Sequence, residues 1–425
     1  MNLPSEDAKL AGSLAAFFAT GRFNRVLGWV MLVVGFGAMI FVEPWIFSVR
    51  DPQELLGSAQ MQLRHAQGVL LAMALLQLVV GYVLTTKAFS LEFRLQASLC
   101  IGLGAMAYSG GYALLFCFSF GGLLVLVGSL LNLGTFLCAL RVEIGGVAAI
   151  QVRLSLFVLC LGMFLDFVSG VMSLYPDLVQ LEWFGTQDEV RWRMLRLARV
   201  AGIALPVLTL LFFDLVDRTG AQGRLVKWGH RGFLVGSLTM TLTLALASFA
   251  FLEIKYLLTI PSTAVCFGAV SACVLAWRHA GRLEVLGWWI ITGSLFGGML
   301  IGMYAFDGPF PAPSGVENYQ AMSRRLMRVG HASAIVFGML VLFLAQRTLG
   351  VHWGGVANRL GVVCYLVGAA LSLSTMTVAT LLELPAGPIC NISACCQAAM
   401  AVFQASSIAV CFDARSLLSS RTAAA

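Results

Sequence analysis

The chain has 425 residues, of which 59% are hydrophobic and only 11% are charged. A soluble domain carries about 25% charged residues, so this composition excludes an ordinary soluble protein and predicts an all-α polytopic membrane protein in a lipid bilayer. The net charge of +7 does not indicate a nucleic-acid partner, because in a membrane protein the informative property is where the positive residues lie.

Residues 1–22 are polar and amphipathic, and we expect them to form a cytoplasmic N-terminal segment. They lack the basic start, apolar core and cleavage site of a secretory signal, so we expect them to belong to the mature chain. Twelve apolar runs follow, each long enough to cross a membrane as a helix. Residues 413–425 then form a predicted cytoplasmic tail. The twelve predicted spans are 23–48, 62–85, 95–118, 121–140, 154–175, 193–213, 232–252, 259–277, 285–305, 326–346, 358–382 and 389–412.

The positive residues predict the orientation of these spans. With the N-terminus in the cytoplasm, 17 of the 27 Lys and Arg fall in cytoplasmic segments and 10 in outer segments. The positive-inside rule therefore predicts that both termini are cytoplasmic, and we expect the inner (cytoplasmic) membrane of a bacterium. Seven of the outer charges cluster at residues 191–199 and 324–328. This clustering runs against the usual bias and indicates a specific role.

An internal repeat organises the chain. Residues 61–81, 193–213 and 324–344 each have arginine in their first turns, then small residues, then an aliphatic run. A spacing of about 131 residues predicts three copies of a four-helix unit related by pseudo-three-fold symmetry. The predicted repeats cover residues 23–140, 141–277 and 278–412.

Two histidines occupy corresponding positions in this repeat. Aligning RHAQGVLL with GHASAIVF superposes His65 on His331 without a gap, and the middle copy has Val200 there. Both histidines lie about one turn inside the outer boundary of their predicted helices.

This arrangement resembles the catalytic subunit of haem-copper oxidases, a family with twelve helices in three four-helix arcs and cytoplasmic termini. There the second and tenth helices each give one histidine to a low-spin haem near the outer face; here those helices carry His65 and His331. The resemblance implies a low-spin haem b with two axial histidines, which suits electron transfer because no site is left open for oxygen. Arginines near these histidines are expected to hold the haem propionates. The candidates are Arg64, Arg328, Arg324 and Arg325.

The sequence departs from the family at the oxygen-reducing centre. Val329 stands where the family has its high-spin haem ligand, and no histidine lies near Val200 or in FLEIKYLLTIPS, where copper ligands are expected. An active oxidase or nitric oxide reductase is therefore disfavoured. The implied function is electron transfer or structural support within a larger membrane redox complex, without a catalytic centre of its own. The implied partners are other membrane subunits and a quinone or an external cytochrome.

Asp166 is a further candidate, because a carboxyl group inside the membrane is a functional hypothesis by default. Three interpretations stay open for it: a protonated acid, the partner of an arginine, or part of a proton path. The histidines also have a second interpretation as interfacial residues of a haem-free scaffold or transporter. Glycine pairs in SGGY (109–112) and FGGM (296–299) predict close helix packing. No nucleotide-binding or hydrolase motif stands in a suitable context.

Overall fold

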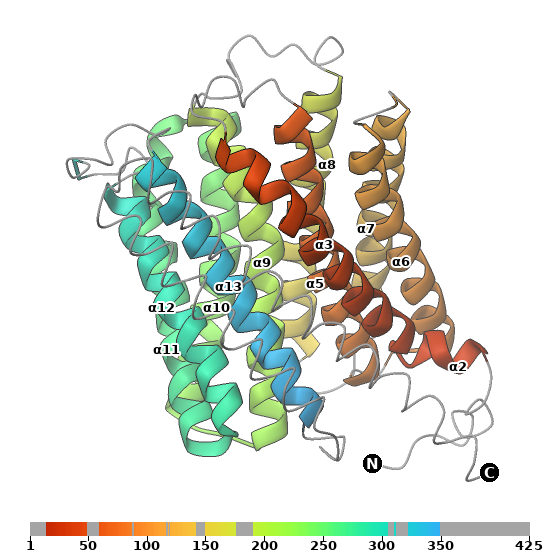
Figure 1. Cartoon of the computed structure of the whole chain (residues 1–425). Coiled ribbons are helices and arrows are strands. Elements are labelled where there is room, and N and C mark those ends of the chain that lie inside the picture. Colours follow the sequence, from red (N-terminus) through yellow and green to blue (C-terminus); the bar gives the residue numbers. More distant parts are fainter. Residues whose placement is uncertain are drawn as a thin grey trace. The chain divides into compact units, whose positions relative to one another are not determined.

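The computed structural model describes residues 14–48, 59–86, 89–115, 118, 120–141, 149–175, 190–304, 310–311 and 322–348. The described chain is almost entirely helical (Figure 1). It divides into two compact units, with the boundary at the start of α8. Unit 1 contains the described helices α2 (Leu14–Ala19), α3 (Arg22–Ser48), α5 (Ala59–Thr86), α6 (Leu91–Leu114) and α7 (Gly121–Arg141). Unit 2 contains α8 (Ala149–Leu174), α9 (Val190–Thr219), α10 (Arg224–Phe249), the short 3-10 helix η2 (Leu252–Leu258), α11 (Thr259–His279), α12 (Arg282–Tyr304) and α13 (Met322–Thr348).

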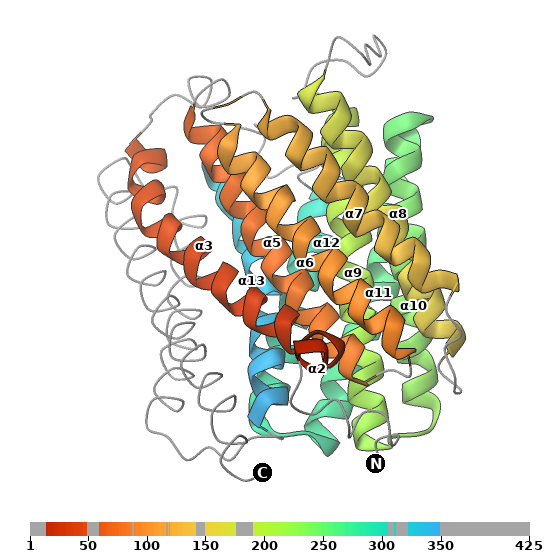
Figure 2. The ribbon, with the colours of Figure 1, turned by 90° about the vertical axis from the view of Figure 1, so that its right-hand side faces the viewer.

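Unit 1 is a set of long helices in which α5 packs on α3, α6 on α5, and α7 on α6 (Figure 2). A buried polar network fastens three of them. Asn24 of α3 donates to the Oε1 of Gln77 on α5 at 2.6 Å, and the hydroxyl of Ser98 on α6 donates to the Oδ1 of Asn24 at 2.5 Å. Such side-chain hydrogen bonds between helices hold membrane bundles together, because no water competes for them.

Small residues bring α6 and α7 into backbone contact. A Cβ placed on Gly104 would lie 3.0 Å from the carbonyl oxygen of Gly128, and one on Gly111 would lie 2.7 Å from the amide nitrogen of Val125. Only residues without a side chain permit this approach, which is the usual basis of tight helix pairs in a bilayer. The second glycine of SGGY therefore serves packing as predicted, whereas Gly110 has no neighbour within 4 Å.

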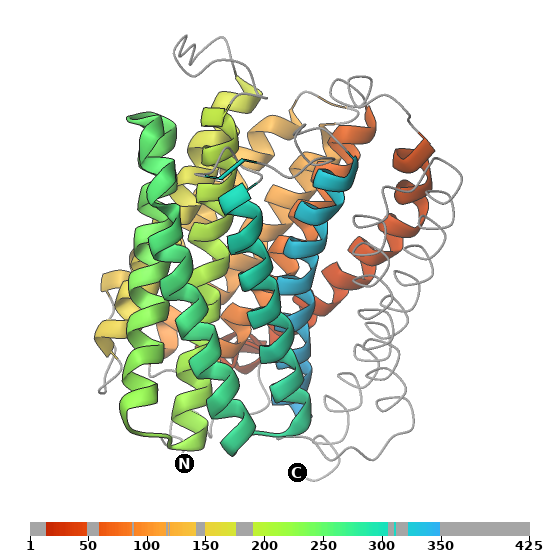
Figure 3. The same ribbon diagram turned by 90° about the vertical axis from the view of Figure 1, so that its left-hand side faces the viewer.

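Unit 2 is also built from neighbours in sequence, since α10 packs on α9, α11 on α10, α12 on α11 and α13 on α12 (Figure 3). Gly162 of α8 and Gly202 of α9 bring these two helices together, because a Cβ on Gly202 would lie 2.6 Å from the Cα of Gly162. Next to this contact, Leu165 of α8 and Ala198 of α9 join a buried apolar cluster that also includes Leu244 of α10.

Glycine also shapes the short connection between α9 and α10. Gly220 follows the last residue of α9 with φ 61°, and Gly223 precedes α10 with φ 112°. Residues with a Cβ are strained at positive φ, so these two glycines allow the chain to reverse direction within four residues.

Eight helices, α5 to α12, are long and apolar enough to cross a membrane in the part of the chain that the structure describes. Large apolar side chains on them are exposed, as with Leu123, Phe267 and Trp277, while polar side chains such as Asn132 are buried. Exposed apolar and buried polar side chains suit a lipid environment, as expected of a multi-pass membrane protein. The first ten predicted spans each correspond to one described helix from α3 to α13, and four of them, at 95–118, 154–175, 232–252 and 285–305, run past the end of that helix. The spans predicted at 358–382 and 389–412 lie outside the described residues, so the count of twelve stays a prediction.

Candidate functional site

His331 of α13 is fastened to α12 by a reciprocal pair of hydrogen bonds with Ser294. Its Nδ1 lies 2.7 Å from the carbonyl oxygen of Ser294, and the Ser294 hydroxyl donates to the carbonyl oxygen of His331 at 2.7 Å. A carbonyl oxygen can only accept, so Nδ1 carries a proton. In the neutral ring Nε2 then keeps its lone pair and is a potential metal ligand.

The second glycine of FGGM provides the surface on which the His331 ring lies. A Cβ at Gly298 would overlap the imidazole, with Nε2 only 2.5 Å away. Gly297 beside it has no neighbour within 4 Å. The ring therefore packs closely against the backbone of α12 at Gly298 and is held there by the Ser294 contacts.

The other residues predicted around the haem fall on the expected helices. Arg64 and His65 belong to α5 of unit 1, and Arg328 and His331 belong to α13 of unit 2. The structure describes the helical backbone at residues 64, 65, 324 and 325, and their side chains lie outside the described set. Because the two histidines belong to separate units, their pairing stays a prediction.

Asp166 of α8 lies beside Arg199, one of the arginines that cluster at the start of α9. The Arg199 Nη1 is 3.4 Å from the Asp166 Oδ1 and 3.5 Å from the hydroxyl of Ser169. The two charged side chains are 14% and 9% exposed. The geometry is therefore that of an ion pair in which one carboxylate faces one guanidinium, the second of the three interpretations of Asp166.

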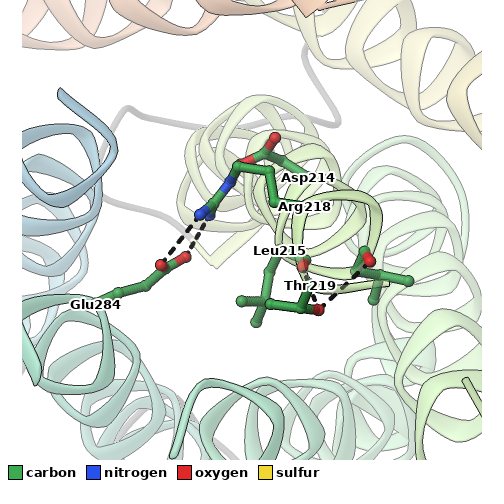
Figure 4. A network of polar contacts seen from close by, with 6 residues as sticks. Asp214, Leu215, Arg218, Thr219 and Glu284 are labelled. Carbon is green, nitrogen blue, oxygen red and sulfur yellow. Dashed lines mark hydrogen bonds and ion pairs between the residues drawn. The ribbon is translucent and has the colours of Figure 1, made fainter. Parts of the chain in front are cut away.

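A larger charged cluster joins the C-terminal end of α9 to the start of α12. Arg218 lies between two acids (Figure 4), with its Nε 2.7 Å from Asp214 and both Nη atoms directed to the carboxylate oxygens of Glu284. The side chains of Asp214 and Glu284 are 6% and 3% exposed. We call these three residues the α9–α12 charged cluster. Charge-assisted, bidentate bonds of this type are the strong ones, so the cluster fixes the two helix ends in unit 2.

The sequence did not predict this cluster, because the predicted membrane spans stop just short of its residues. Apolarity alone ends the sixth span at residue 213 and begins the ninth at 285, just short of Asp214 and Glu284. In the structure α9 continues to Thr219 and α12 begins at Arg282. An available signal was the spacing of Asp214 and Arg218, since opposite charges four residues apart face each other on a helix.

An aromatic cluster lies in the same region of unit 2. The ring of His230 on α10 is 4.7 Å from that of Phe213, and Phe233 lies 6.1 Å from Trp288 of α12, centroid to centroid. Among the described residues, the Nε2 of His230 and the Nε1 of Trp288 are buried polar atoms without a hydrogen-bond partner. Native proteins leave few such atoms, and a water molecule or another ligand commonly satisfies them.

Within the described part of the chain, no group of three or more His, Cys, Asp or Glu side chains is arranged to hold a metal ion. This finding does not concern a haem, whose iron needs only two axial ligands from the protein. No protein-family model matches the chain, and no curated protein matches it.

Proposed function

We propose that the chain is a membrane subunit that binds one low-spin haem b, with His65 and His331 as the axial ligands, and that it transfers electrons or supports a larger membrane redox complex. The observation that carries this proposal is the hydrogen bond from the Nδ1 of His331 to the carbonyl oxygen of Ser294. Histidines that bind metals commonly donate their other ring N–H to a carbonyl or carboxylate, which fixes the tautomer and the direction of the ring.

The residues present fit such a group. His331 is pre-oriented by Ser294 and packs against the backbone at Gly298, so it would have little freedom to lose when Nε2 binds. When bound, the haem supplies a one-electron carrier. His65 and His331 would occupy both axial positions and thereby exclude oxygen. Arg64 and Arg328, with Arg324 and Arg325, would hold the propionates by charge-assisted hydrogen bonds.

The spectrum of the purified protein tests this proposal. We expect a low-spin b-type absorption spectrum in the wild type, because two imidazoles split the iron d orbitals strongly. His65→Ala and His331→Ala should each lose it. His230→Ala on α10 is the matched control, because it removes a histidine that has no predicted role as a ligand, and it should keep the spectrum. A wild type without a Soret band, or a spectrum that survives both alanine variants, contradicts the proposal.

A second pair of variants tests the seat of the ring. Gly298→Ala adds a methyl group where His331 lies, so we expect it to displace the imidazole and reduce haem content at least tenfold. Gly297→Ala makes the same chemical change on the same helix in open space and should bind haem normally. Equal haem content in the two variants would show that the position of His331 is unimportant for binding.

We also propose the three-repeat architecture and cytoplasmic termini. What supports the repeat is that α3, α5, α6 and α7 pack in order within unit 1, while α9, α10 and α11 pack in order after α8 in unit 2. The helices α12 and α13 then begin a third set. A reporter fused to the C-terminus tests the orientation, because activity confined to the periplasm contradicts it. The proposal includes a partner that exchanges electrons with the chain: a quinone, an external cytochrome or a neighbouring subunit. Cross-linking would identify this partner.

The alternative is a haem-free scaffold or transporter. One observation favours it: the His331–Ser294 contact is complete as a link between α12 and α13, because it satisfies both partners without any ligand. This alternative predicts that His331→Ala weakens the packing of α13 and changes no spectrum. The two proposals are therefore separated by the same purified protein and the same variants.

A further inference from the structure

We propose that the exposed face of α10 binds an anionic phospholipid, with Arg224, Lys227 and Arg231 around the phosphate group and the acyl chains along the apolar residues that follow. The inference concerns unit 2 alone. It goes beyond the proposed electron-transfer function and does not depend on whether the chain binds haem.

One face of α10 is open from the first residue of the helix to its last turn. The other face is buried, and α10 packs on α9 and α11. The exposed positions recur three, four or seven residues apart, which places them on a single face. They are Arg224, Lys227, Trp228, Arg231, Val235, Leu242 and Leu246.

This exposed face changes from cationic to apolar along the helix. Its beginning has the three cations and Trp228, which is 63% exposed. From Val235 to Leu246 its exposed large side chains are apolar, and at 1.5 Å per residue this part is about 16 Å long. One leaflet of the hydrocarbon core is about 15 Å thick, so the cationic part lies at the level of the headgroups.

The three cations have no acidic partner in the described part of the chain. The helix α10 contains no Asp or Glu. The ion pairs of the described residues involve other arginines, and no hydrogen bond is made by the side chains of Arg224, Lys227 and Arg231. Clusters of Lys and Arg at the end of a membrane span attract anionic lipid headgroups. The exposed charge therefore complements a phosphate.

The Arg231 side chain is directed toward the start of the helix. Its Cζ lies 5.9 Å from the centre of the Trp228 ring, a cation–π contact with a residue one turn earlier. A long cationic side chain near the hydrocarbon core directs its charged end toward the headgroups. Trp is the residue typical of that level. The contact thus brings the guanidinium of Arg231 toward Lys227 and Arg224.

The neighbouring helix adds positive charge at the same end. A Cβ on Gly232 would lie 2.8 Å from the amide nitrogen of Gly268, and one on Gly236 would lie 2.9 Å from that of Val265. These pairs show that α10 and α11 run antiparallel, so the last turn of α11 lies at the level where α10 begins. That last turn contains Arg278, which is exposed.

Native mass spectrometry of the full-length protein in detergent tests the proposal. The probes are phosphatidylglycerol, which is anionic, and phosphatidylcholine with the same acyl chains, which is neutral overall. We expect the wild type to bind phosphatidylglycerol at least about tenfold more tightly, because the choline cation offsets the phosphate charge. Inorganic phosphate in large excess should not displace the lipid, because the acyl chains contribute to binding. This comparison needs no substitution that could disturb folding.

Two lysine variants then locate the site. Lys227→Gln should lower the affinity for phosphatidylglycerol about fivefold, the effect of one positive charge near a membrane surface. Lys255→Gln is the matched control, because it makes the same change in η2, which follows the other end of α10. It should bind as the wild type does. The triple variant Arg224→Gln, Lys227→Gln and Arg231→Gln should lose the preference for the anionic lipid.

Four results would each overturn the proposal. In the wild type, these are equal binding of the two lipids, or displacement of phosphatidylglycerol by inorganic phosphate. In the variants, they are an equal effect of Lys227→Gln and Lys255→Gln, or a preference for phosphatidylglycerol that survives in the triple variant.

Discussion

The described part of unit 2 contains two buried arginine–carboxylate contacts that differ in geometry. In the first, Arg199 faces Asp166 at 3.4 Å. In the second, Arg218 is shared by Asp214, at 2.7 Å, and Glu284. Burial is similar, since the acidic side chains are between 3% and 9% exposed. The comparison predicts that Arg218, which holds two buried carboxylates, contributes more to stability than Arg199.

The largest expected effect comes from removing the arginines. Arg218→Gln leaves two buried acids without their shared cation and should lower the free energy of unfolding by about 3–5 kcal/mol, the usual cost of breaking a buried pair. Arg199→Gln leaves one acid with the longer contact and should cost about 1–3 kcal/mol. Denaturant titration in mixed micelles measures both. Equal losses in the free energy of unfolding would show that the second acid, Glu284, adds nothing to the stabilisation by Arg218.

Removing an acid together with its arginine should separate the two contacts further. The double variant Asp166→Asn with Arg199→Gln leaves no charge behind, so its stability should lie within about 1 kcal/mol of the wild type. The double variant Asp214→Asn with Arg218→Gln still leaves Glu284 buried and should cost about 3 kcal/mol. Thermal unfolding in the same detergent compares them. A near-neutral second variant would place Glu284 outside the cluster.

Single neutralisation of each aspartate gives an inverted order. Asp214→Asn should cost less than about 1 kcal/mol, because Arg218 keeps both of its Nη contacts with Glu284. Asp166→Asn should cost about 1–3 kcal/mol, because it removes the carboxylate that the buried Arg199 guanidinium faces. The shorter contact is therefore expected to be the cheaper one to neutralise. A greater loss for Asp214→Asn in denaturant titration would indicate that Arg218 depends on Asp214 more than on Glu284.

The smallest effect belongs to the hydroxyl beside the first contact. Ser169 lies 3.5 Å from the Nη1 of Arg199, at the limit of a hydrogen bond. Ser169→Ala should therefore change stability by at most about 0.5 kcal/mol. Ser155→Ala on the same helix is the control, because that hydroxyl donates only to the carbonyl oxygen of Gln151. A clearly larger loss at Ser169 would mean that Arg199 depends on more than Asp166.

Hydropathy alone was enough to place the helices but not their ends. The span predicted at 232–252 corresponds to a helix that begins at Arg224 and ends at Phe249. The helix begins earlier than predicted because charged residues at its start lower the apolar average although the helical backbone continues. The described helices from α3 to α13 therefore follow the prediction. The contacts that join Asp214 and Glu284 through Arg218 were not predicted. Apolar periodicity contains no information about which helix ends meet.

The candidate residues show the same limit. Asp166 could be selected from sequence because a carboxyl group in an apolar run is rare, but its partner depends on how α8 packs against α9. Likewise His331 could be selected from the repeat, whereas its contacts with Ser294 and Gly298 arise from the packing of α12 on α13. The buried network of Asn24 and Gln77 was also unforeseen, since single amides in apolar runs give no signal of their partners.

The contact between Gly162 and Gly202 has a consequence for the charges near it. Asp166 lies four residues after Gly162, and Arg199 lies three residues before Gly202, so about one turn separates the backbone contact from the ion pair on each helix. The distance between α8 and α9 is thus set by the contact between Gly162 and Gly202, which have no side chains. A single methyl group at either glycine would force the two helices apart. We expect the Arg199–Asp166 distance of 3.4 Å to lengthen beyond the reach of a hydrogen bond. The absence of a Cβ atom at Gly162 and at Gly202 thereby allows Arg199 and Asp166 to meet.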